Sequence, residues 1–281
     1  MIGVVHCTDH ELSANNKKDV PIEEPIANNV VAAAREEQPP ADDGDDHNGQ
    51  GGAHAMLPML FQPHLYRPAT ILVMGDSFVR RLKEFARRKF GENDNLGFQF
   101  HMANVSWYGV GGLTIDRFRH HHMQNVFNVR PDILFIQLGS NDLADAHKSP
   151  EEVANAMELL VEDFLDAGVH QVIVSQVLFR EGRGLPARVH NYNGKVTIFN
   201  FMNKLTFNPN YTDVARFWYH KGLWHKRQTT LCHDGVHFNS RGSRNYYRSV
   251  RGALMQALTR VRANLARPVQ APANRPAILE F

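Results

Sequence analysis

One stretch of the sequence limits the fold more than any other, because an apolar run leads into a small polar turn and then into a helical pattern. Thr70–Met74 is followed by Gly75-Asp76-Ser77 and by Val79–Phe90, where apolar residues recur at helical spacing. This order predicts a buried strand, a tight turn and a helix. A serine in such a turn lies near a helix N-terminus, where exposed backbone N–H groups favour developing negative charge. Asp and Ser are also ordinary capping residues, so the turn alone does not separate catalysis from capping.

Apolar runs and helical patterns alternate along the chain that follows. The further predicted strands are Phe98–Val105, Ile133–Leu138, Val169–Val177 and Val214–Tyr219. The further predicted helices are Ile115–Phe127, Ser149–Ala167, Val189–Leu205 and a last one that begins at Asn239 or Ser240. Strands that alternate with helices at this spacing are typical of parallel β-α-β units. The sequence therefore predicts an α/β fold, a three-layer α/β/α sandwich around a parallel five-stranded sheet.

Composition divides the chain into one domain and two tails. The first part contains Pro39-Pro40, an acidic run at Asp42–Asp46 and a glycine-rich stretch at Gly49–Gly52, and buries too little apolar surface to offset the entropy cost of ordering. We therefore expect a disordered acidic tail at 1–68, a folded domain at 69–266 and a Pro-rich tail at 267–281. Residues 1–69 hold four Lys or Arg against eleven Asp or Glu, and the remainder holds twenty-seven against eighteen. The predicted domain is therefore basic.

The cysteine count and the N-terminal residues indicate an intracellular protein of a reducing compartment. The chain has two cysteines, Cys7 in the tail and Cys232 in the domain, so no disulfide framework is indicated. Met1–Val20 lacks the continuous apolar core of a signal peptide, and no stretch reaches the roughly eighteen apolar residues of a membrane span. We therefore expect an intracellular protein. His120–His122 predict no metal site, because neighbouring helical positions point in different directions and cannot converge on one ion.

Small polar motifs occur at three predicted strand ends or in the loops that follow, and a fourth precedes the last helix. They are Gly75-Asp76-Ser77, Gly111-Gly112, Gly139-Ser140-Asn141-Asp142 and Asp234-Gly235-Val236-His237. Because the carboxyl ends of parallel strands share one edge of the sheet, these motifs can meet.

The chemistry that the four motifs offer together is nucleophilic acyl transfer. Ser77 is the candidate nucleophile, His237 the base that removes its proton, and Asp234 the carboxylate that orients the imidazole. The backbone N–H groups of Ser77 and Gly112 and the side-chain amide of Asn141 are candidate donors to a tetrahedral oxyanion. A carboxylate partner favours the charged imidazole, so we expect Asp234 to raise the pKa of His237.

With these motifs in this order, residues 69–265 resemble the SGNH hydrolase superfamily, also called GDSL-like lipases and esterases. In that resemblance Ser77 corresponds to the nucleophile, Gly112 and Asn141 to oxyanion donors, and Asp234 and His237 to the D-x-x-H block. Phe78 stands where the family usually has leucine, and Arg80-Arg81 follow where small residues are frequent. The resemblance implies a flavodoxin-like fold and a serine esterase without metal or cofactor. Its substrate would be an acyl or acetyl ester of a small molecule, glycan or lipid.

A second hypothesis is that the domain is a binding module rather than an enzyme. Arg244, Arg248 and Arg251 recur on one face of the last predicted helix, where they can follow a phosphate backbone. In that case a hydrolase-like domain would hold nucleic acid or protein through its basic surface, within a mobile-element or germ-line type polypeptide. The intact set of polar motifs favours the esterase, because a domain freed from catalysis has no physical need to keep it. The sequence leaves the oligomeric state open.

Overall fold

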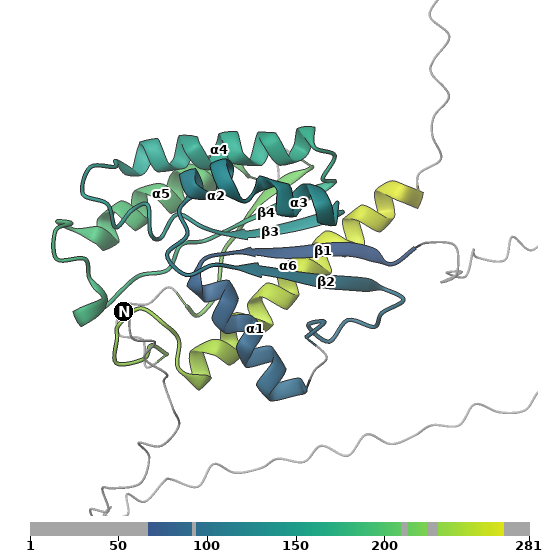
Figure 1. Cartoon of the computed structure of the whole chain (residues 1–281), viewed down its shortest axis with the longest axis horizontal. Helices are drawn as coiled ribbons and strands as arrows, with labels where there is room; N and C mark the ends of the chain where they lie inside the picture. The colour runs from purple at the N-terminus through teal and green to yellow at the C-terminus, as the bar shows by residue number, and fades with distance from the viewer. Residues whose placement is uncertain (1–66, 92–93, 209–212, 224–229, 267–281) are drawn as a thin grey trace, which may run out of the picture. The chain divides into compact units, whose positions relative to one another are not determined.

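The computed structural model describes residues 67–91, 94–208, 213–223 and 230–266 (Figure 1). Apart from Arg67 and Pro68, both predicted tails lie outside these ranges, so their disorder stays a prediction. Among the helices described, none is long and apolar enough to cross a membrane. The elements are β1 (Ala69–Gly75), α1 (Ser77–Phe90), β2 (Ala103–Gly109), α2 (Ile115–His121), α3 (Met123–Val129), β3 (Ile133–Gln137), α4 (Pro150–Asp166), β4 (Gln171–Ser175), the short 3-10 turn η2 (Gly182–Gly184), α5 (Tyr192–Thr206), β5 (Ala215–Trp218) and α6 (Ser240–Ala266).

The strands form one five-stranded parallel sheet in the order β2-β1-β3-β4-β5, which is the flavodoxin-like order. Helices α1 and α6 cover one face, and α2, α4 and α5 cover the other (Figure 1). The alternation of side chains along each strand explains the two cores: Ile71 and Val73 of β1 pack toward α1 and α6, whereas Leu72 and Met74 pack toward the opposite layer. The predicted three-layer α/β/α fold is confirmed.

The second strand begins later than the sequence pattern predicts. Phe98 does not start it, because residues 95–102 form turns in which the N–H of Phe98 donates to the Asn95 carbonyl at 2.9 Å. The Asn95 side chain is buried and forms hydrogen bonds with the backbone of this segment. Its amide nitrogen donates to the carbonyls of Phe98 and Ala103, and its oxygen accepts from the N–H of Val105. The apolar pattern from Phe98 onward could not show that the Asn95 side chain forms these backbone hydrogen bonds, which a neighbouring strand would otherwise form.

The helix predicted over Ile115–Phe127 is two helices, α2 and α3, that meet at His122. The backbone of His122 leaves the helical region (φ −129°, ψ −5°), while its N–H still donates to the Phe118 carbonyl. The His122 Nδ1 atom lies 2.6 Å from the Tyr108 hydroxyl at the end of β2. This tertiary contact accompanies the break, and no glycine or proline marks it in the sequence.

The first strand is tied to the start of β3 by an ion pair. Arg67 donates from both terminal nitrogens to the Asp132 carboxylate at 2.8 and 2.6 Å, and the Thr70 N–H donates to it at 2.7 Å. Burial raises the pKa of Asp132, but the hydrogen bonds from Arg67 and Thr70 outweigh burial and hold the pKa below its usual value. The ordered domain therefore reaches back at least to Arg67.

Candidate active site

The turn between β1 and α1 places Ser77 at the first position of the helix. Gly75 is required because a Cβ atom there would clash with the backbone oxygen of Gln137 in β3. Asp76 is the N-cap, and its side chain accepts a hydrogen bond from the Phe78 N–H at 2.9 Å. Burial raises the pKa of Asp76 to about 7. The cap therefore fixes the backbone around Ser77, and Ser77 itself stays partly exposed.

The loop before α6 brings His237 to Ser77. The Ser77 hydroxyl lies 2.9 Å from His237 Nε2, and His237 Nδ1 lies 2.7 Å from Asp234 Oδ2. The other carboxylate oxygen of Asp234 accepts from the N–H groups of Val236 and His237, each at 2.9 Å. Asp234 thus holds both the backbone and the ring of His237. The structure brings the three residues into one hydrogen-bonded chain, although 160 positions separate Ser77 from His237.

The pKa of His237 differs from the value expected from its contact with Asp234 alone. Burial lowers the pKa of His237 below its ordinary value, and the charges of Arg81 and Arg180 act in the same direction. The hydrogen bond and charge of Asp234 oppose this shift without reversing it. The expected rise in the His237 pKa is therefore wrong, because the sequence does not show burial or the two arginines. Burial also raises the pKa of Asp234, but its hydrogen bonds to His237 outweigh burial and keep that pKa low.

The remaining predicted site residues lie at the ends of the neighbouring strands β2 and β3. Gly112 follows β2 with φ +69°, a backbone conformation that favours glycine. Asn141 follows β3, and its side-chain nitrogen donates to the Leu113 carbonyl at 3.0 Å. One of its two N–H groups is thereby used, and the bond ties the loop after β3 to the loop after β2. Since β2, β1 and β3 are adjacent in the sheet, Ser77, Gly112 and Asn141 come from consecutive strand ends.

Arg180 is a residue near the site that the sequence analysis did not single out. Its guanidinium donates to the carbonyl and the hydroxyl of Ser140 at 3.1 and 2.9 Å and lies 4.8 Å from the ring centre of Tyr192. Its loop also meets the Asp234 turn, because the Glu181 N–H donates to the Gly235 carbonyl at 2.8 Å. The only signal in the sequence is an arginine shortly after a predicted strand, which is too common to identify a site residue.

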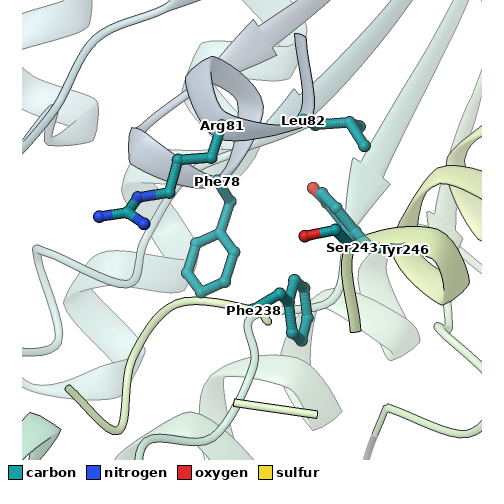
Figure 2. A pocket seen from close by; sticks show the side chains of 6 residues that line it. All are labelled: Phe78, Arg81, Leu82, Phe238, Ser243 and Tyr246. Carbon is teal, nitrogen blue, oxygen red and sulfur yellow. The ribbon is translucent and has the colours of Figure 1, made fainter. Parts of the chain in front are cut away.

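Two hollows are lined by residues that adjoin the candidate site residues in the chain. The first is lined by residues of α1, of α6 and of the loop that precedes α6. Figure 2 shows the rings of Phe78, Phe238 and Tyr246 around it, while the guanidinium of Arg81 points away. At about 10 Å³ it has room for no more than one water. The second is an open depression of about 330 Å³ beside the Asp234 turn, lined by Glu181, Gly182, Arg183, Leu231, Cys232, His233 and Gly235. Only the second hollow is large enough for part of a ligand.

A second serine–histidine contact lies inside the protein. His220 Nε2 is 2.7 Å from the Ser175 hydroxyl, and His220 Nδ1 is 2.8 Å from the Ser249 hydroxyl. His220 is fully buried, and burial lowers its pKa to about 3. His220 is therefore neutral near pH 7, and among the described residues it pairs with two serines and no carboxylate. It links β4 to α6, and because it is fully buried a substrate cannot reach it.

Within the described ranges, no three His, Cys, Asp or Glu side chains are grouped in a way that could hold a metal ion. No protein-family model and no curated protein matches the chain. Among solved structures, a candidate acylhydrolase from Bacteroides fragilis is 18% identical over 69% of this chain and 92% of its own, with a TM-score of 0.57. At that identity the similarity shows a shared fold.

Two further solved structures are similar at a lower level. An acetyl esterase is 16% identical over 69% of this chain and 99% of its own, with a TM-score of 0.49. A GDSL-like lipase from Bacteroides thetaiotaomicron is 15% identical over 67% of this chain and 89% of its own, also with a TM-score of 0.49. The fold expected from the sequence resemblance is thus also the fold of the Bacteroides fragilis protein.

Proposed function

We propose that this chain is a serine ester hydrolase in which Ser77 attacks the ester carbonyl. The hydrogen-bonded chain from Ser77 through His237 to Asp234, with distances of 2.9 and 2.7 Å, supports the proposal most directly. It contains a nucleophile, a base and a carboxylate in the order that acyl transfer needs.

The first half of the reaction forms an acyl-enzyme. His237 Nε2 takes the proton from the Ser77 hydroxyl as its oxygen bonds to the carbonyl carbon, and the carbonyl oxygen becomes an oxyanion. Asp234 keeps the proton on Nδ1, so that Nε2 is free to accept, and stabilises the imidazolium that forms. His237 then gives its proton to the departing alcohol as the tetrahedral intermediate collapses.

The second half repeats these steps with water as the nucleophile. His237 removes a proton from water, the hydroxide attacks the acyl carbon, and Ser77 leaves with the proton returned by His237. In both halves the oxyanion would accept hydrogen bonds from the backbone N–H groups of Ser77 and Gly112 and from the second side-chain N–H of Asn141. Ser77 is the first residue of α1, so the positive end of the helix dipole adds to this stabilisation.

The substrate we propose is an acyl or acetyl ester of a small molecule, glycan or lipid. The aromatic cluster of Phe78, Phe238 and Tyr246 would support the catalytic pair from behind, since the Phe78 ring lies 5.8 Å from the His237 ring. The cavity inside this cluster is too small for an acyl chain.

The test is hydrolysis of p-nitrophenyl acetate by the full chain, by Ser77→Ala and by Ser106→Ala, a half-buried serine of β2, as the matched control. We expect Ser77→Ala to lose turnover by about three orders of magnitude or more, and Ser106→Ala to retain it. Mass spectrometry after treatment with a fluorophosphonate should find the adduct on Ser77. A wild-type protein that neither hydrolyses activated esters nor reacts with the probe would refute the proposal.

A further inference from the structure

Charge is divided unequally between the two helical layers. Helices α1 and α6 together carry twelve Lys or Arg and one acid, Glu84. On the opposite face, α4 carries six acids and no Lys or Arg. The two layers lie on opposite sides of the sheet (Figure 1), so the domain has one strongly basic face. Such a face attracts polyanions.

The arginines of α6 form a regular stripe. Arg241, Arg244, Arg248 and Arg251 are spaced three, four and three residues apart, which places them along one side of the helix. At a rise of 1.5 Å per residue the stripe is about 15 Å long. The part from Arg241 to Arg248 is about 10 Å long. A stacked nucleic acid strand carries one phosphate per 3.4 Å, so this part can follow about three phosphates.

Most of this stripe is available to a ligand. Arg241, Arg244 and Arg248 are exposed, and none of them forms an ion pair within the part of the chain that the structure describes. Arg251 is committed to the protein instead: its Nε donates to the Leu96 carbonyl at 3.0 Å, and its guanidinium lies 5.5 Å from the centre of the Phe98 ring. Arg251 therefore fixes the loop before β2 against the end of the stripe.

Exposed aromatic rings accompany the basic face. Phe90, the last residue of α1, is 52% exposed and stacks on Tyr247 of α6, with ring centres 4.9 Å apart. Phe100 is 62% exposed, two residues after the ring over which Arg251 lies. Exposed aromatic rings beside a cationic track are the elements that single-stranded nucleic acid uses, because unpaired bases stack on them while phosphates bind the cations.

We infer that the α1/α6 face binds single-stranded nucleic acid, an activity separate from ester hydrolysis. Ten of the twelve cations are arginines, whose planar guanidinium matches phosphate with two parallel hydrogen bonds. A membrane surface fits less well. An interfacial helix buries a broad apolar face in lipid, whereas the apolar sides of α1 and α6, including Leu82, Val250 and Leu254, are buried in the core.

The experiment measures fluorescence anisotropy of a labelled oligothymidine of about 20 nucleotides with the full chain, between about 50 and 200 mM salt. Arg248→Gln is compared with Lys204→Gln, which removes one exposed charge from a helix of the opposite layer. If Arg248 binds a phosphate, its loss should weaken binding and reduce the slope of log K against log salt by about 0.7. Lys204→Gln should change neither.

Phe100→Ala tests stacking, and it should lower affinity while leaving the salt slope unchanged. Both binding variants should hydrolyse esters like wild type, and Ser77→Ala should bind the oligonucleotide normally, so this inference and the proposed hydrolase fail independently. No binding at about 50 mM salt, or equal losses in Arg248→Gln and Lys204→Gln, would overturn it. Capture of phosphatidylserine vesicles without binding of the oligonucleotide would overturn it in favour of a membrane surface.

Discussion

Replacing Asp234 with Asn tests the proposed role of the carboxylate with little change in shape. In wild type, Asp234 Oδ2 accepts from His237 Nδ1 at 2.7 Å, while Oδ1 accepts from the backbone N–H groups of Val236 and His237. An asparagine can keep its oxygen toward the two backbone donors. Its NH₂ group then faces Nδ1 and forces Nδ1 to accept a hydrogen bond.

This change reverses the tautomer of His237. With the proton moved to Nε2, the imidazole donates toward Ser77 and cannot take the serine proton. The loss expected from a reversed tautomer in a serine–histidine–carboxylate triad is about four orders of magnitude in kcat, which corresponds to about 5.5 kcal/mol of transition-state stabilisation. Because the backbone hydrogen bonds of the turn survive, the thermal unfolding midpoint should change little.

The assay is single-turnover acylation with an activated ester, measured from acidic to alkaline pH together with thermal unfolding. Asp145→Asn is the matched control, because Asp145 is an exposed carboxylate that accepts from the N–H of His147 and lies outside the proposed triad. An Asp234→Asn protein with wild-type rate and pH profile would refute the assignment, even if Ser77 proved to be the nucleophile. A large loss in Asp145→Asn would point to a different carboxylate.

Three further predictions concern pH and stability. Because His237 must be neutral to act as a base and its pKa is lowered, the acid limb of kcat/KM should lie below the ordinary histidine value of about 6.5. Arg81→Gln removes a charge that lowers this pKa, so the acid limb should move to higher pH. An acid limb that does not move would contradict the assignment of His237 as the base. His220 has a folded pKa of about 3, so it lowers the free energy of unfolding as the pH falls below about 6.5, whereas Asp76, with its pKa raised to about 7, increases the free energy of unfolding as the pH falls from there. Each effect amounts to about 1.4 kcal/mol per pH unit, and the two have opposite signs. In urea unfolding from pH 7 to about 5, His220→Asn should therefore gain stability relative to wild type, and an unchanged slope would count against the buried neutral histidine. We also propose that residues 1–65 are dispensable, so a chain beginning at residue 66 should keep its unfolding midpoint. Arg67→Ala removes an ion-pair partner of buried Asp132 and should lower the stability by about 1 kcal/mol in thermal unfolding. A loss of cooperative unfolding in the truncated chain would show that the removed segment belongs to the core.

Local patterns were enough to predict the α/β fold and to nominate candidate site residues, whose catalytic roles stay a prediction. Apolar runs that alternate with helical patterns predicted the five strands of the described sheet. The strands β1, β3 and β4 are mostly apolar because they are buried on both faces. The edge strands β2 and β5 are only partly buried and include polar residues. The Gly75-Asp76-Ser77 turn could also be predicted from its residue types. The structure gives the reason for those types, because a Cβ at Gly75 would clash with the backbone of Gln137 and the helix cap needs an acceptor at Asp76. Right-handed crossovers leave several strand orders possible. The flavodoxin-like order was implied by the family resemblance, and the sheet has that order.

Only the tertiary structure decided the features that depend on contacts between distant segments. The Asn95 side chain ties the turn at Phe98 to Ala103 and Val105 of β2, and the predicted helix is divided at His122, where His122 meets Tyr108. The pKa of His237 falls because packing buries it and brings Arg81 and Arg180 near, neither of which adjoins it in the chain. The sequence shows which groups are present and how they are spaced locally. Burial and the distances between remote charges are determined only when the helices pack against the sheet.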